Sequence, residues 1–146
     1  MFVGFFAISN QYSFFRLEPA AAKVFDFSAG KDGEELDLSD EFFKSPKLVR
    51  HAKYYMSMVD RAVGLLGPDI ELLTEILLEL GVKHERFGVK ASYYVPMGQA
   101  LIQTLEELLG KDKYFTDDIK DSWLEVYQAL SYDMIRAKQA AMREKL

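Results

Sequence analysis

Apolar residues recur at intervals of three and four along most of the chain, the spacing that lines one face of an α-helix. Proline and glycine divide this pattern into blocks, because neither residue is favourable inside a helix. The period-two alternation of half-buried strands is nearly missing. The predicted fold class is therefore all-α. Helices are expected at residues 4–17, 46–66, 70–84, 91–109 and 117–143, with a short turn at 20–25.

The ends of these blocks carry capping signals. Ser45 followed by Pro46 is typical of an N-cap and a first helical position, and Thr116 precedes the last helix in a similar way. Pro96 fits its helix only within the first turn, where a missing N–H breaks no hydrogen bond. Gly81 is expected to weaken the end of its helix.

One stretch departs from the helical pattern. Residues 28–44 combine two glycines with many acidic side chains, a mixture that favours a solvated connection over a packed element. The whole chain has 146 residues, a length that suits one compact core. We therefore expect a single domain over residues 1–146, with a long acidic surface loop at 28–44.

Charge and composition narrow the range of partners. The net charge of -5 argues against nucleic acid as a partner, because phosphate binding needs clustered Lys and Arg. No apolar run approaches the roughly 20 residues of a membrane span, so no membrane partner is expected. The apolar start lacks a basic leader, which favours a cytoplasmic location. Cysteine is absent, so any metal must use His, carboxylate or Met.

The chain has only two histidines, and both fall on apolar helix faces. His84 follows Leu77 and Leu80 at helical spacing, while His51 shares its face with Met58 one helix earlier. Two helices joined by a tight turn would present one imidazole each to a shared space, which suits a planar metal cofactor. A pair of hydrogen-bonded core histidines is the competing interpretation. Zinc fits less well, since it usually takes three or four protein ligands.

The residues around these histidines resemble the globin family, and the likeness extends from about residue 5 to residue 137. Residues 45–63, SPKLVRHAKYYMSMVDRAV, resemble the E helix with its distal histidine. Residues 80–90, LGVKHERFGVK, resemble the end of the F helix with its proximal histidine. Residues 14–19, FFRLEP, followed by Phe25, resemble the end of the B helix and the phenylalanine that packs on haem. Within the family, the chain resembles neuroglobin-like and bacterial single-domain globins.

This resemblance implies a three-over-three helical sandwich whose A helix is missing or shortened, because the chain starts close to the B helix. It implies haem b, with His84 as the axial metal ligand, His51 above the iron as a second metal ligand or as a hydrogen-bond donor to the bound gas, and Phe25 packed on the porphyrin. It also places five further residues at the cofactor: Leu80, Val89, Tyr94, Tyr55 and Gln11.

The distal side is unusually polar for this family. Tyr55 stands where globins carry a small aliphatic residue, and Gln11 stands where they carry Phe, Leu or Tyr. Together with His51, these side chains could hydrogen-bond a bound oxygen molecule. Two alternatives remain for Tyr55: its ring turns outward, or its hydroxyl captures the His51 imidazole.

The resemblance implies reversible binding of O2, NO or CO, for oxygen binding or transport, sensing, or removal of NO. The sequence lacks the Gly-x-Gly-x-x-Gly dinucleotide fingerprint, so catalytic turnover would need an external reductase. Two other functions remain open. One is a haem-free globin-fold interaction or sensor module. The other is a haem enzyme, such as an NO dioxygenase or nitrite reductase, that works with an external reductase.

Overall fold

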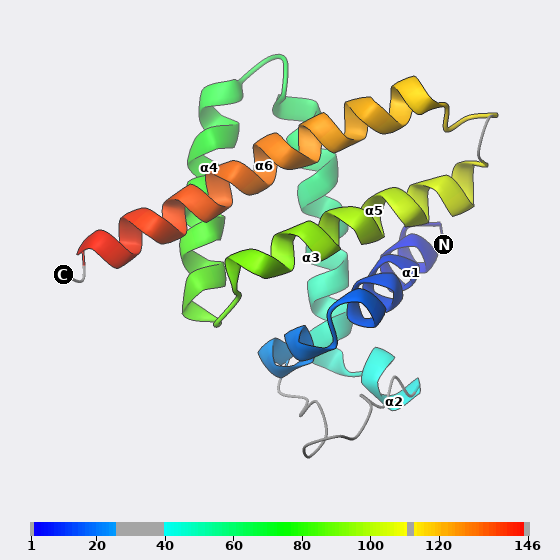
Figure 1. Ribbon diagram of the computed structural model, residues 1–146, viewed down its shortest axis with the longest axis horizontal. Coiled ribbons are helices and arrows are strands. Elements are labelled where there is room, and N and C mark those ends of the chain that lie inside the picture. Colours follow the sequence, from blue (N-terminus) through cyan, green and yellow to red (C-terminus); the bar gives the residue numbers. More distant parts are fainter. Residues whose placement is uncertain (1, 26–39, 111–112, 145–146) are drawn as a thin grey trace.

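The computed structural model describes residues 2–25, 40–110 and 113–144, and every regular element in these ranges is helical (Figure 1). The elements, with η for a 3-10 helix, are α1 (Phe2–Leu17), η1 (Pro19–Phe25), α2 (Asp40–Phe43), α3 (Pro46–Leu65), α4 (Ile70–Arg86), η2 (Ala91–Tyr93), α5 (Tyr94–Leu109) and α6 (Asp117–Glu144). The predicted all-α class is confirmed. None of these described helices is both long and apolar enough to cross a membrane.

The predicted capping residues mark where helices begin. The Ser45 hydroxyl accepts a hydrogen bond from the Leu48 N–H at 3.3 Å, and the Thr116 hydroxyl accepts one from the Ile119 N–H at 3.4 Å. Each bond satisfies a backbone donor that the first turn of a helix leaves unpaired. Pro96 lies in the first turn of α5, because η2 takes up the residues before it. These local signals fix the direction in which α3 and α6 start.

The long helices cross in two layers. In Figure 1, α5 and α6 run antiparallel across α3 and α4, which also form an antiparallel pair. α1 packs against both α3 and α5. The space between α1, α3 and α5 is therefore closed on three sides by helices. Aromatic rings of α1, η1 and α2 fill one end of it, with Phe14, Phe15, Phe25 and Phe42 all buried.

The contact between α4 and α6 depends on a glycine. A Cβ atom at Gly81 would lie 2.4 Å from the carbonyl oxygen of Met134, far inside any real contact distance. The two helices can therefore approach this closely only because Gly81 has no side chain. α4 nevertheless continues without interruption through Gly81 to Arg86. Packing against α6 compensates for the low helix propensity of glycine.

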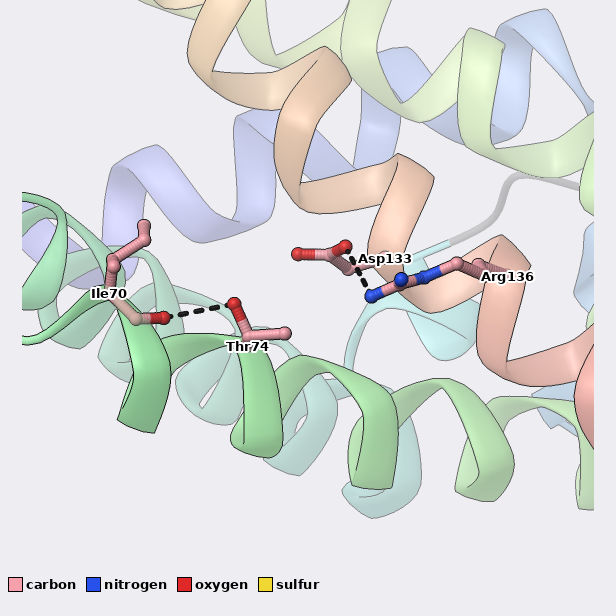
Figure 2. Close-up of polar contacts among 4 residues, drawn as sticks. All are labelled: Ile70, Thr74, Asp133 and Arg136. Atoms are coloured by element: carbon pink, nitrogen blue, oxygen red, sulfur yellow. Dashed lines mark hydrogen bonds and ion pairs between the residues drawn. The ribbon is translucent and has the colours of Figure 1, made fainter.

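Polar contacts near the same pair of helices are local. The Thr74 hydroxyl donates to the Ile70 carbonyl at 2.9 Å within α4, and Arg136 binds Asp133 at 3.1 Å within α6 (Figure 2). Such exposed contacts contribute little to the packing of one helix on another. Burial of Leu73 and its apolar neighbours stabilises the pair instead. These neighbours are Ala62, Leu77, Met58, Leu65, Leu66, Leu130 and Met134.

The predicted acidic loop at 28–44 is wrong at its C-terminal end. Residues 40–43 form α2, and the Phe42 side chain is only 1% exposed. Its ring meets that of Phe15 edge to face, with centroids 4.9 Å apart. Burial of a phenylalanine outweighs the preference of the flanking acidic residues for solvent. Residues 28–39 of the predicted loop lie outside the described residues.

Candidate functional site

The two histidines face each other between α3 and α4. The centroids of the His51 and His84 rings are 6.4 Å apart, and the ring planes meet at 63°. The Ser45 cap places His51 in the second turn of α3, whereas His84 lies in the last turns of α4. The structure thus brings together the two side chains that the sequence singled out as metal ligands.

His84 is held in one tautomer. Its Nδ1 atom lies 2.8 Å from the carbonyl oxygen of Leu80, four residues earlier in α4. A carbonyl oxygen can only accept, so Nδ1 carries the proton and Nε2 keeps its lone pair. Burial lowers the pKa of His84, although the bond to Leu80 opposes that shift. At neutral pH, His84 therefore offers an unprotonated nitrogen, the form that binds a metal.

His51 is also neutral, and three different groups surround it. Burial lowers its pKa to about 4, and the charge that His84 would carry contributes less. The Phe25 ring meets the imidazole edge on, with centroids 5.0 Å apart. On the side of Nδ1, Gln11 Nε2 lies 3.3 Å from that nitrogen. The glutamine that the sequence predicted on the distal side therefore contacts the His51 side chain.

The predicted proximal residues lie in two groups. Val89 packs against the buried cluster that contains Phe25. The Tyr94 ring stands beside His84, with centroids 6.4 Å apart. Burial raises the pKa of Tyr94 to about 12, and the charge of Glu85 adds to this, so the phenol stays protonated. The Leu80 backbone contributes the carbonyl that orients His84.

The start of α5 is anchored from α6. The Tyr127 hydroxyl donates to the carbonyl of Tyr94, and a Cβ atom at Gly98 would lie 2.5 Å from the Tyr127 ring. The tyrosine therefore occupies the space that glycine leaves free one turn later in α5. This contact fixes the helix start that carries Tyr94 beside His84.

A buried polar cluster lies on the α1 side of His51. Asn10 and Gln11 of α1 are almost completely buried, and the Tyr55 hydroxyl of α3 is buried as well. Three of their atoms have no hydrogen-bond partner among the described residues: Asn10 Oδ1, Gln11 Oε1 and the Tyr55 hydroxyl. The Tyr55 hydroxyl is thus not turned to solvent, and no bond to His51 captures it. Burial raises the pKa of Tyr55, and the Asn10 side chain opposes the shift.

Sequence reasoning missed Asn10. Its Nδ2 atom contacts the sulfur of Met97 at 3.5 Å, which ties α1 to α5. The available signal was its spacing, because Asn10 and Gln11 stand one helical turn before the buried pair Phe14 and Phe15. A polar residue on such a stripe is buried with the stripe. Placement on an apolar face therefore marks both residues as inward-facing.

A small apolar cavity adjoins this cluster. Its volume is about 120 Å³, and it is partly open to the outside. Its lining comes from α1, α2 and α3: Ile8, Gln11, Phe43, Leu48, Val49, Ala52 and Lys53. Gln11 thus lies between the cavity and the imidazole of His51.

The chemistry of the site suits a planar cofactor that brings most of its own ligands. Within the described ranges, no three His, Cys, Asp or Glu side chains are grouped so as to hold a bare metal ion. Two neutral imidazoles that face each other could together hold the iron of a porphyrin. The two ring centroids are 6.4 Å apart. This leaves room for one metal atom between the rings, because a metal–imidazole bond is about 2.0–2.1 Å long.

Comparison with known proteins agrees with this geometry. The family model described as Globin matches residues 12–134, which include both histidines. The neuroglobin of Danio rerio is 30% identical over 122 residues, which are 84% of this chain and 72% of the relative. The neuroglobin of Tetraodon nigroviridis and neuroglobin-2 of Oncorhynchus mykiss match with the same identity and coverage. Both the match and the paired histidines carry the implication of haem binding, and the chain belongs to the globin family.

Proposed function

We propose that this chain is a b-type haem protein that binds O2, NO or CO reversibly at the iron, with His84 as the proximal ligand and His51 on the distal side. The observation that carries this proposal is the pair of neutral imidazoles facing each other at 6.4 Å. Bound haem would supply the iron to which a diatomic gas can bind.

On the proximal side, the chain holds one imidazole ready to bind. The Leu80 carbonyl keeps the proton on His84 Nδ1, which orients the ring and raises the basicity of Nε2. Tyr94 stays protonated beside it, so it adds no negative charge to the site. This arrangement favours stable retention of the cofactor.

Phe25 and Val89 would exclude water from the porphyrin. Both belong to one cluster of apolar side chains, and Phe25 is 8% exposed. An aromatic side chain on a porphyrin face buries apolar area and adds contacts that slow dissociation. A dry pocket also strengthens any hydrogen bond to a bound, partly negative ligand.

On the distal side, His51 has two possible roles toward the iron. It can coordinate through an unprotonated Nε2, or it can donate from a protonated Nε2 to a bound gas. We favour coordination in the gas-free state, because the ring already faces His84 at a separation that accommodates one metal. If His51 held the iron, a gas would have to displace it, and the apparent affinity would fall by the fraction of time that the site is open. The buried Tyr55 hydroxyl would be a second donor to the bound ligand.

Haem titration of the purified chain and two variants tests this proposal. The unmodified chain should bind one haem per chain. His84→Ala should lose haem or hold it weakly, and added imidazole should restore binding because it replaces the missing ligand. His51→Leu should retain haem, since the proximal bond remains.

Far-UV circular dichroism of each variant separates loss of a ligand from loss of the fold. Normal haem retention by His84→Ala without imidazole would contradict the proximal assignment. A correctly folded, unmodified chain that binds no haem would favour the haem-free interaction module.

A further inference from the structure

The histidines differ in what faces their Nδ1 atoms. His84 Nδ1 faces a backbone carbonyl, which fixes one tautomer. His51 Nδ1 faces the side-chain amide of Gln11, which has an NH2 donor at one end and an oxygen acceptor at the other. In the structure the NH2 end faces Nδ1, which places the proton of the neutral imidazole on Nε2, so coordination of a metal by His51 requires the amide to turn.

Each orientation of the amide prepares His51 for a different task. With the NH2 group toward His51, Nδ1 accepts and the proton must sit on Nε2, which can then donate to a bound gas. With Oε1 toward His51, Nδ1 donates and Nε2 keeps a lone pair for a metal. A carboxylate at this position could only accept, and an apolar side chain could do neither.

No other hydrogen bond from the described residues fixes either orientation of Gln11. The side chain is 1% exposed, and its Oε1 atom has no partner among the described residues. Turning the amide would therefore pair Oε1 with His51 and leave the NH2 group without a partner in its place. The cavity of about 120 Å³ that Gln11 lines gives the side chain space to turn.

We propose that Gln11 is a positioning residue that selects the tautomer of His51: its carbonyl supports coordination of the iron, and its NH2 group supports donation to a bound gas. This inference rests on the proposed haem function. It assigns Gln11 a contact with His51, where the sequence suggested a direct contact with the ligand. Neither state needs a protonated imidazole, so the exchange operates on a neutral side chain.

Two substitutions separate this role from simple space filling. Gln11→Met keeps a similar length without an amide, and Gln11→Glu keeps the acceptor without the donor. Gln99→Met, on an exposed position of α5, controls for the amide-to-thioether change itself. The haem-loaded full chain is assayed for the rate of CO binding to the reduced form, for the O2 dissociation rate and for the iron reduction potential.

The two variants should change the protein in opposite directions. Gln11→Met should speed CO binding about three- to tenfold, roughly the effect of one hydrogen bond, because coordination by His51 weakens. It should also raise the reduction potential and speed O2 dissociation. Gln11→Glu should slow CO binding and lower the potential, because a charge-assisted bond makes His51 a stronger ligand. Gln99→Met should match the unmodified chain.

Equal shifts in the same direction, or no shift, would show that Gln11 only fills space and would overturn the inference. If the buried carboxylate of Gln11→Glu prevents folding, the Gln11→Met variant alone tests the inference. Unchanged or slower CO binding by Gln11→Met would then overturn it. The unmodified chain is measured first. If the unmodified chain binds no haem, both the proposed function and this inference are refuted. If it binds haem but the Gln11 variants behave like the unmodified chain, the inference alone is refuted.

Discussion

Gly81→Ala tests the closest helix contact in the fold. The added Cβ would lie 2.4 Å from the Met134 oxygen, 2.8 Å from its Cα and 2.9 Å from its carbonyl carbon. All three are backbone atoms, so no side-chain rotation relieves the clash, and α4 and α6 must separate. Overpacking of this kind destabilises by about 1–3 kcal/mol. The better helix propensity of alanine offsets at most about 1 kcal/mol of that.

Because all three clashes are with backbone, we take the upper end of the overpacking range, and after the propensity offset we expect Gly81→Ala to lower the free energy of unfolding by about 2 kcal/mol. Urea unfolding, followed by far-UV circular dichroism at equal haem content, measures the change. Gly64→Ala is the matched control, because Gly64 also lies in a helix but, among the described residues outside its own helical turn, no heavy atom lies within 4 Å of the place that an added Cβ would take. It should stabilise by about 0.4–1 kcal/mol.

The two substitutions should thus have opposite signs. A Gly81→Ala protein as stable as the unmodified chain would refute the close crossing of α4 on α6. Since His84 lies three residues after Gly81 on the same helix, separation of the helices should also move the proximal imidazole. Faster haem loss should accompany the lower stability.

Three further predictions concern the haem pocket. His51→Leu should convert a six-coordinate, low-spin reduced spectrum to a five-coordinate, high-spin one and speed CO binding; an unchanged spectrum would exclude His51 as a ligand. Phe25→Ala should speed haem transfer to a scavenger protein severalfold, and an unchanged rate would count against its place on the porphyrin. Burial lowers the His51 pKa to about 4, so the imidazole stays neutral above that pH and protonates only below it. CO binding should therefore be insensitive to pH from about 8 to about 5 and speed up only near pH 4; a midpoint near 6.5 would contradict this burial.

Local sequence signals predicted most of the helices because their causes are local. Ser45 and Thr116 mark helix starts through bonds to backbone three residues away, which spacing alone can show. The helical stripe likewise placed His51 and His84 on inward faces. The capping bonds and the helical stripe both depend on contacts or spacings within a single helix.

The features that the sequence did not reveal depend on contacts between elements. The packing of Phe42 on Phe15 stabilises the short helix α2. The acidic residues near Phe42 in the sequence predicted a solvated loop instead. The role of Gly81 follows from the path of α6, which no local pattern shows. The contact between Gln11 and His51 joins α1 to α3 across 40 residues, so only the packed structure shows which group the amide meets.

The absorption spectrum of the purified, reduced chain without added ligand tests the central claim most directly. If His84 and His51 both bind the iron, the spectrum should be that of low-spin, six-coordinate haem, and CO should replace one ligand slowly. A five-coordinate, high-spin spectrum would contradict coordination by His51 and leave it the role of hydrogen-bond donor. A folded chain that stays colourless after addition of haem would contradict the account as a whole.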